Sequence, residues 1–187
     1  MIRRVGRLAL LLPHYARTGL RGLLAHHRPG AREHHVAQAV VLREGQVLLA
    51  VRSDLRGWEL PGGRVDPGEE PEETVVREVA EETGLEVEVE RAVGRYHRRG
   101  FLPHTAFVFR CRPRAGQLRP SPETPRVAWW DLGELPATLF PWYREPLRDA
   151  LAEHAPPVER SEHQGLRAIA TGMRIDLRMR ISGDRAR

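Results

Sequence analysis

Residues 63–85 read GRVDPGEEPEETVVREVAEETGL, and this stretch decides both the fold and the chemistry that the sequence predicts. Within it, Glu78, Glu81 and Glu82 stand at positions i, i+3 and i+4, so a helix would place their carboxylates on one face. Like charges at this spacing repel one another, and a surface helix has no structural need of them. Hard divalent ions prefer carboxylate oxygens and often bridge to phosphates. The stretch therefore predicts a metal-binding helix.

The spacing of the other residues in this stretch resembles the Nudix box, the signature of the Nudix hydrolase superfamily. The family pattern is a Gly, five residues, a Glu, seven residues, Arg-Glu, an aliphatic residue, any residue, Glu-Glu, any residue, Gly and an aliphatic residue. The chain matches it without a gap at Gly63, Glu69, Arg77, Glu78, Val79, Glu81, Glu82, Gly84 and Leu85. A glutamate-rich solvated helix is the competing interpretation, which the additional constraint on Gly and Arg disfavours.

This resemblance covers about Val36 to Leu151 and is strongest within the box. It implies an α/β fold, an α/β/α sandwich built around a mixed sheet. It also implies that the chain is a pyrophosphohydrolase, which hydrolyses a nucleoside diphosphate linked to another moiety. Water would attack a metal-bridged diphosphate, and charge neutralisation with positioning carries most of such catalysis. The implied cofactor is Mg²⁺, with Mn²⁺ as a substitute.

Two other functions compete with hydrolysis. A Nudix-fold binding or regulatory module would recognise nucleotide, nucleic acid or anionic membrane without turnover, but the intact set of Glu78, Glu81 and Glu82 favours an enzyme. Isomerisation of an isoprenoid diphosphate would need a Cys and a Glu placed for carbon protonation. Cys111 is the single cysteine, and it lies in an apolar run typical of a small core residue.

Carried over position by position, the resemblance implies a role for each residue of the box. Glu78 and Glu82 would be direct metal ligands, and Glu81 a third or water-mediated ligand. The main-chain carbonyl of Gly63 would be a further ligand. Arg77 would orient the carboxylates rather than touch the substrate.

The general base stays open at this point. Glu69 would bind metal through water or help to activate the nucleophile, and its alternative is a charge placed at a helix N-terminus by the macrodipole. Glu81 and Glu69 are the first choices for the base, and Glu123 is the third.

Three residues outside the box are candidates for substrate binding: Arg52, Trp58 and Glu123. The ring of Trp58 could stack on a base, although a place in the core is an equal alternative. Glu123 lies in a loop where relatives often carry Glu, whereas Arg126 stands where many relatives have another Glu. The marks of the NADH, coenzyme A, ADP-ribose and RNA 5′-end subgroups are missing or misplaced. A nucleoside triphosphate or a nucleotide sugar therefore stays open as the substrate.

Composition bounds the compartment and the partners. The chain has 187 residues, a formal net charge of +5 and one cysteine, which excludes an internal disulfide and favours the cytoplasm. Between residues 59 and 90 it carries twelve acidic side chains and two arginines, so the rest is strongly basic. An acidic metal site within a basic surround suits a nucleotide-type polyanion. Nucleic acid is disfavoured as a partner.

Three segments are predicted: a basic helical extension at 1–35, the Nudix domain at 36–155 and a basic tail at 156–187. Apolar periodicity and turn residues predict the elements of the middle segment. These are strands at 36–42 and 47–51 joined by Glu44-Gly45, the box helix at 71–83 ended by Gly84, strands at 87–96, 105–112 and 127–130, an exposed loop at 113–125, and a helix from Pro141 or Trp142 to His154.

The two ends carry arginines next to apolar residues. Residues 1–35 hold seven arginines beside apolar residues at helical spacing, which predicts an amphipathic helix. It would lie on an anionic membrane or, as the favoured alternative, pack on its own domain or on a second subunit of a homodimer. In the tail, apolar and charged residues alternate around Thr171-Gly172, which predicts a β-hairpin with a basic face.

Overall fold

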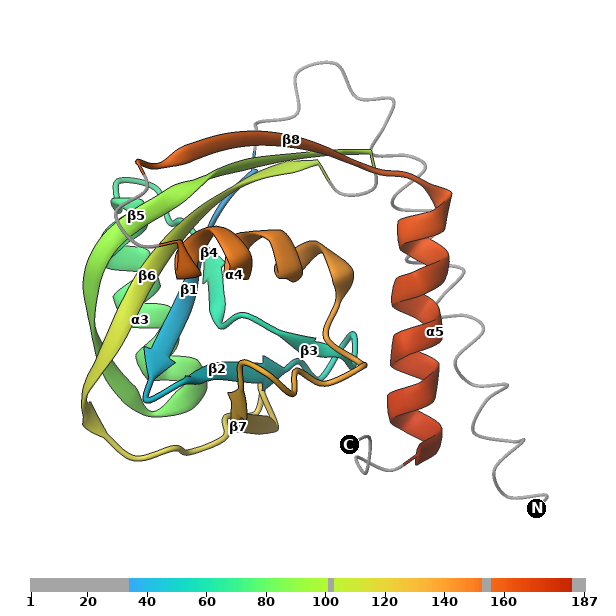
Figure 1. Cartoon of the computed structure of the whole chain (residues 1–187), viewed down its shortest axis with the longest axis horizontal. Helices are drawn as coiled ribbons and strands as arrows, with labels where there is room; N and C mark the ends of the chain where they lie inside the picture. Colours follow the sequence, from blue (N-terminus) through green and yellow to red (C-terminus); the bar gives the residue numbers. More distant parts are fainter. Residues whose placement is uncertain (1–33, 101–102, 153–155, 183–187) are drawn as a thin grey trace.

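The computed structural model describes residues 34–100, 103–152 and 156–182 (Figure 1). The predicted N-terminal helical extension covers residues 1–35, of which 1–33 lie outside the described residues, and residues 34–35 begin β1. In chain order the elements are β1 (His34–Arg43), β2 (Gln46–Val51), β3 (Trp58–Glu59), β4 (Gly62–Arg64), α3 (Pro71–Thr83), β5 (Leu85–Gly100), β6 (His104–Gly116), β7 (Arg126–Asp131), the 3-10 helix η1 (Pro141–Tyr143), α4 (Arg144–Leu151), β8 (Val158–Gln164) and α5 (Leu166–Ser182).

One mixed sheet holds the described strands together. Its order is β3-β2-β1-β6-β5-β8, and β4 pairs with β1 while β7 pairs with β2. The pairs β1–β6 and β5–β8 are parallel, and the other pairs are antiparallel. The predicted turn at Glu44-Gly45 joins β1 to β2, with φ of 47° and 78°. Positive φ at both central residues gives a turn whose twist matches that of the strands.

Helices cover both faces of this sheet, as Figure 1 shows for α3 and α4. Side chains alternate between the faces of a strand, so Ala39 of β1 belongs to the core under α3, while Val40 belongs to the core on the other face. Val75 and Val79 of α3 are fully buried, and such a side chain contributes about 1.5–3 kcal/mol. The predicted α/β/α sandwich with a mixed sheet is confirmed.

The box helix α3 has the bounds that the sequence predicts, because its ends are specified locally. Pro71 occupies the first turn, where a missing N–H costs no intrahelical bond. The carboxylate of Glu73 accepts from the Glu70 N–H at 3.1 Å. At the other end Gly84 adopts a left-handed φ of 74° and donates its N–H to Ala80 O at 3.0 Å. The carboxylates of the box therefore stand on a well-anchored helix.

The predicted C-terminal hairpin is wrong, because the tail forms β8 and the helix α5. β8 pairs in parallel with β5 and extends the sheet of the preceding domain. The buried positions of α5 are Gly172, Ile175, Asp176 and Met179, which is helical spacing. The alternation in the sequence was misleading, since Leu, Met, Ala and Arg are strong helix formers. Burial of Ile175 and Met179 in the hydrophobic core that also holds Phe140 then selects the helix.

The closing helix and the loop before β7 differ slightly from the prediction. The helix begins as η1 and continues as α4 to Leu151, and residues 153–155 of the predicted span lie outside the described residues. β6 runs on to Gly116, so the exposed loop starts later than predicted. No helix in the part of the chain that the structure describes has the length and apolar character needed to cross a bilayer.

Candidate active site

Arg77 is the central cation of the box. Its guanidinium donates from Nε to Glu69 Oε1 at 2.9 Å and from NH2 to Glu69 Oε2 at 3.0 Å. Its NH1 donates to Glu78 Oε1 at 3.0 Å and to Glu81 Oε2 at 3.3 Å. One arginine thus holds three carboxylates, and the bidentate pair with Glu69 fixes its plane. Arg77 therefore contacts the carboxylates of the box, and its orienting role stays a prediction.

Glu69 is fully engaged by hydrogen-bond donors. Besides Arg77, its Oε2 accepts from Thr74 Oγ1 at 2.7 Å and from the Asp66 N–H at 3.2 Å. The hydrogen bonds from Arg77 and then Thr74 lower the pKa of Glu69 to about 2. A carboxylate with so low a pKa is a weak base near neutral pH. The structure therefore favours Glu69 as an anchor for Arg77 over Glu69 as the general base.

Glu82 is the buried carboxylate of α3, and Glu78 is partly buried, with its side chain 16% exposed. Glu82 is only 5% exposed, and its Oε2 accepts from the Gly62 N–H at 2.9 Å. Burial raises the pKa of Glu82 to about 7, and the charge of Glu78 adds to the rise. Burial also raises the pKa of Glu78, although Arg77 opposes it. Two anions therefore stand in a site that neutralises them incompletely.

The carboxylate of Glu78 lies against Gly63 of β4, in the space that a side chain there would fill. A Cβ atom on Gly63 would lie 2.6 Å from Glu78 Oε2 and closer still to the carboxyl carbon, so only glycine leaves room for the carboxylate. The main-chain N–H of Gly62 thus hydrogen-bonds Glu82, and Gly63 lies directly against the carboxylate of Glu78. Carboxylate oxygens such as those of Glu78 and Glu82 are the donors that Mg²⁺ and Mn²⁺ prefer.

The residues present fit a divalent cation by this chemistry, although the cluster is not closed. Within the described ranges no three His, Cys, Asp or Glu side chains converge as a ready ligand cage. Glu81, the third predicted ligand, is 61% exposed at its side chain and pairs with Arg77. Glu78 and Glu82, beside Gly63, are therefore the best-placed candidates for metal ligands.

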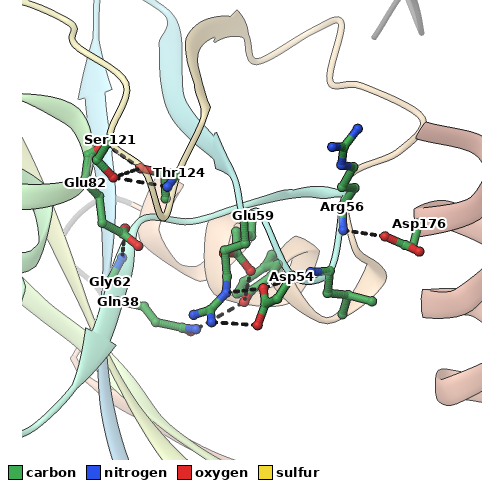
Figure 2. A network of polar contacts seen from close by, with 12 residues as sticks. Gln38, Asp54, Arg56, Glu59, Gly62, Glu82, Ser121, Thr124 and Asp176 are labelled. Atoms are coloured by element: carbon green, nitrogen blue, oxygen red, sulfur yellow. Dashed lines mark hydrogen bonds and ion pairs between the residues drawn. The ribbon is translucent and has the colours of Figure 1, made fainter. Parts of the chain in front are cut away.

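The loop before β7 lies against the C-terminal end of α3. Thr124 Oγ1 donates to the main-chain oxygen of Glu82 at 2.6 Å, and Ser121 Oγ contacts Thr124 Oγ1 at 2.9 Å (Figure 2). Glu123 between them is exposed, and its charge contributes to the raised pKa of both Glu78 and Glu82. The structure thus brings Glu123 near the box, as an arriving substrate or cation would require.

Arg52 lies in the loop after β2 and belongs to a second polar cluster. It donates from Nε and NH2 to the carboxylate of Asp54, both at 2.9 Å, and its Nε lies 3.9 Å from Glu59 Oε1. Tyr143 donates its O–H to Glu59 Oε2 at 3.1 Å. Burial raises the pKa of Glu59 to about 8, against the opposing charge of Arg52. The charge of Glu82 adds to this rise, so the cluster adjoins the box.

Sequence reasoning missed Gln38, Glu59 and Tyr143. Gln38 Nε2 contacts Tyr143 Oη at 3.4 Å, and its buried Oε1 has no hydrogen-bond partner among the described residues. A buried amide oxygen left unpaired is costly, so it is a candidate contact for a polar ligand. The only signal available was strand alternation, since Glu59 follows the apolar Trp58 and therefore projects to the other side.

Trp58 is not in the substrate site, and its prediction as a stacking residue is wrong. Its side chain is 1% exposed and packs edge to face against Trp130, with ring centroids 5.2 Å apart. No ring face is left for a nucleobase, so the alternative of a core residue is correct. Cys111 is also buried, and burial raises the pKa of its thiol to about 12, which disfavours any nucleophilic role.

Comparison with known proteins identifies the family. The NUDIX domain model matches residues 33–150. A MutT-like protein of Streptomyces ambofaciens is 40% identical over 139 residues, which cover 73% of this chain and 87% of that protein. A human 8-oxo-dGDP phosphatase is 37% identical over 113 residues, or 56% of this chain and 34% of that protein.

Solved structures agree with this match. The crystal structure of an ADP-ribose pyrophosphatase from Streptococcus suis superimposes with a TM-score of 0.57 at 28% identity, covering 69% of this chain and 98% of that one. A mixed sheet between helices, with carboxylates on a capped helix beside a glycine loop, defines a Nudix fold. The chain belongs to the Nudix hydrolase family of pyrophosphohydrolases.

Proposed function

We propose that the chain is a Mg²⁺-dependent enzyme that hydrolyses a nucleoside diphosphate linked to another moiety, in the cytoplasm. The observation that carries the proposal is the pair of carboxylates on α3, the buried Glu82 and the partly buried Glu78, beside the main chain of Gly62 and Gly63. Burial raises the pKa of both Glu78 and Glu82. Two charged carboxylates so placed are therefore unfavourable without a cation beside them. A protein that only bound nucleotide would have no need of such a pair.

This arrangement supports one set of metal ligands. Mg²⁺, or Mn²⁺ in its place, would be held by the carbonyl oxygen of Gly63 and the carboxylates of Glu78 and Glu82, with Glu81 acting through water. When bound, the cation would act as a Lewis acid and neutralise the negative charge of the diphosphate. Arg77 keeps the carboxylates in place through its anchor on Glu69.

The general base is proposed from the remaining carboxylates. Glu69 is set aside because its oxygens accept four hydrogen bonds and its pKa is lowered. Glu81 and Glu123 are exposed, so either would be accessible to a water molecule that attacks a bound diphosphate. The dependence of kcat/KM on pH in Glu81→Gln and Glu123→Gln assigns the role. The variant that lacks the general base loses the fall in activity at acid pH.

The nucleotide would lie between the box and the cluster around Arg52. The guanidinium of Arg52 supplies a cation for a phosphate, and the unpaired Oε1 of Gln38 supplies an acceptor for a base or sugar. The relatives bear names for different substrates, 8-oxo-dGDP in one and ADP-ribose in another. The substrate is therefore proposed only as a nucleotide with a phosphoric anhydride, including nucleoside triphosphates and nucleotide sugars.

A hydrolysis screen tests the proposal. Nucleoside triphosphates, 8-oxo-guanine nucleotides, ADP-ribose, NADH, dinucleoside polyphosphates and capped RNA are each incubated with Mg²⁺ or Mn²⁺. The expected result is metal-dependent turnover that Glu82→Gln lowers by more than about 100-fold, because even outer partners of metal ligands cost 10–100-fold. Glu72→Gln is the matched control, as an exposed glutamate on the same helix. Absence of turnover with every substrate would favour a binding module instead.

A further inference from the structure

Asp176 is a fully buried carboxylate that neither the box nor the core explains. It lies on α5, beyond the residues 33–150 that the family model matches, and it is 0% exposed. Ile175 and Met179, its neighbours on the helix, belong to the same hydrophobic core as Leu147 and Ala150 of α4. Burial of a charge is costly unless it is paired and hydrogen-bonded, so the contacts of Asp176 show what it holds.

Those contacts reach the loop between β2 and β3. Asp176 Oδ1 accepts from the main-chain N–H of Arg56 at 2.7 Å (Figure 2). Arg180, one turn further along α5, donates from Nε to the two oxygens of Asp176 at 2.9 Å and 2.8 Å. Its NH2 donates to the main-chain oxygen of Asp54 at 3.0 Å. The Asp176–Arg180 pair therefore grips this loop at two main-chain atoms.

The same loop carries Arg52 of the proposed substrate site. The carboxylate of Asp54 accepts the Leu55 N–H at 2.8 Å and binds Arg52 in bidentate fashion. That bidentate bond sets the plane of the Arg52 guanidinium, whose charge acts on both Glu59 and Glu82. A series of polar contacts thus runs from α5 through the loop to Arg52 and Glu59.

Close packing ties the helix to this loop as well. A Cβ atom on Gly57 would lie 2.9 Å from Ile175 Cγ2, and it would clash with the ring of Phe140. The loop main chain therefore rests directly on α5 at Gly57, one residue after the hydrogen bond to Arg56. Any shift of α5 would be passed to the loop rather than absorbed by a gap.

We propose that Asp176 is a positioning residue for Arg52, and that α5 thereby sets how the enzyme holds the phosphates of its substrate. This proposal rests on the proposed function. Asp176 does not touch the substrate. It holds the 52–57 loop in the one arrangement that presents the Arg52 guanidinium toward a nucleotide bound at the box.

Asp176→Asn tests the proposal in the full chain. The asparagine keeps the shape but loses the charge that pairs with Arg180. We expect KM for the nucleotide that the wild type hydrolyses to rise about tenfold with a smaller change in kcat, as for loss of one charge-assisted hydrogen bond. Hydrogen exchange of the 52–57 peptide, which includes the Arg56 N–H, is expected to become faster.

Asp149→Asn is the matched control. Asp149 of α4 accepts from Arg160 at 2.8 Å and 2.7 Å and from Tyr96 Oη at 2.7 Å, so it is also an aspartate held by an arginine. Its contacts join α4 to β5 and β8 rather than to the 52–57 loop. This control is expected to lower the melting temperature while it leaves KM and exchange of the 52–57 peptide unchanged.

A double-mutant cycle separates positioning from stability. If Asp176 acts through Arg52, Asp176→Asn adds nothing to KM in an Arg52→Ala background. The proposal is overturned if the two effects multiply, if Asp149→Asn raises KM equally, or if Asp176→Asn changes neither KM nor exchange. A wild type that hydrolyses no nucleotide refutes the proposed function instead, and exchange at residues 52–57 still decides whether Asp176 holds the loop.

Discussion

Replacement of Gly63 by alanine is predicted to lower activity strongly without unfolding the protein. The φ of Gly63 lies outside the left-handed region, so the main chain accepts alanine there. The new Cβ would lie 2.6 Å from Glu78 Oε2, whereas ordinary contacts begin at 3.4 Å. The atoms in conflict belong to the end of a flexible side chain, so the carboxylate of Glu78 retreats while the fold stays.

The magnitude follows from that displacement. The carboxylate of Glu78 has to move by about 1 Å, and a misplacement of about 1 Å in a catalytic site costs roughly 100-fold in rate. A Gly→Ala change at a compatible position stabilises by about 0.4–1 kcal/mol through the unfolded chain. Loss of the Arg77–Glu78 bond offsets that gain by a similar amount. The free energy of unfolding should therefore change by less than about 1 kcal/mol.

Gly62→Ala is the control with the opposite outcome. Gly62 has φ of 148°, and a Cβ atom there would lie 2.8 Å from Gln38 Cα and collide with the main-chain oxygen of Ala37. Rigid main chain cannot retreat as a carboxylate can, so we expect a loss of about 1–3 kcal/mol. That loss is about 2–10 °C in melting temperature for a domain of this size.

Steady-state kinetics with Mg²⁺ and thermal unfolding measure the two variants side by side. Gly63→Ala should lose about 100-fold in kcat/KM and keep its melting temperature. Full activity in Gly63→Ala, or a fall in melting temperature as large as that of Gly62→Ala, would refute the reasoning that Gly63 exists to admit the Glu78 carboxylate.

Three further predictions concern the arginine clamp, an acid-sensitive contact and the N-terminal extension. Arg77→Lys cannot make the bidentate bond to Glu69, so kcat/KM should fall about 10–100-fold in the same assay, and an unchanged value would contradict the clamp. Arg160, followed by Tyr96, lowers the pKa of Asp149. The folded-state pKa is therefore below the unfolded value of about 3.9, and this stabilisation is present above that value and lost as pH falls through the folded pKa. Asp149→Asn should cost about 1–3 kcal/mol at pH 7 by denaturant unfolding, and a difference from wild type that does not shrink towards pH 3 would exclude the contact as its cause. If the N-terminal extension lies on a membrane, the full chain should float with anionic liposomes and residues 36–187 should not. Equal flotation of both proteins would exclude the extension as a membrane anchor.

The box helix and the strands around it could be predicted because their signals are local. Pro71, Glu73 and Gly84 specify the ends of α3 within a few residues of the bonds they make. The alternation in β1 and β2 and the Glu44-Gly45 turn act over a similar range. The spacing of Arg77 with Glu78 and Glu81 likewise predicts contacts within one turn, and the structure contains them.

The remainder of the site depends on residues far apart in the chain. Glu59 meets Tyr143 across 84 positions, and Arg56 meets Asp176 across 120. No periodicity reports such a pairing, because it arises only when separate elements pack on one face of the sheet. The burial of Trp58 has the same cause. From the sequence alone, a Trp just before the glycines of the box is compatible with a core position and with a binding site.

By itself, therefore, the sequence determined the family, the box helix and the set of carboxylates that would hold a cation. Tertiary structure alone decided that Trp58 is core and that the tail is β8 and α5. It also placed a buried aspartate of the tail on the loop that bears Arg52. The physical reason is range: caps, turns and helical spacing act between neighbours, whereas burial depends on which distant surfaces meet.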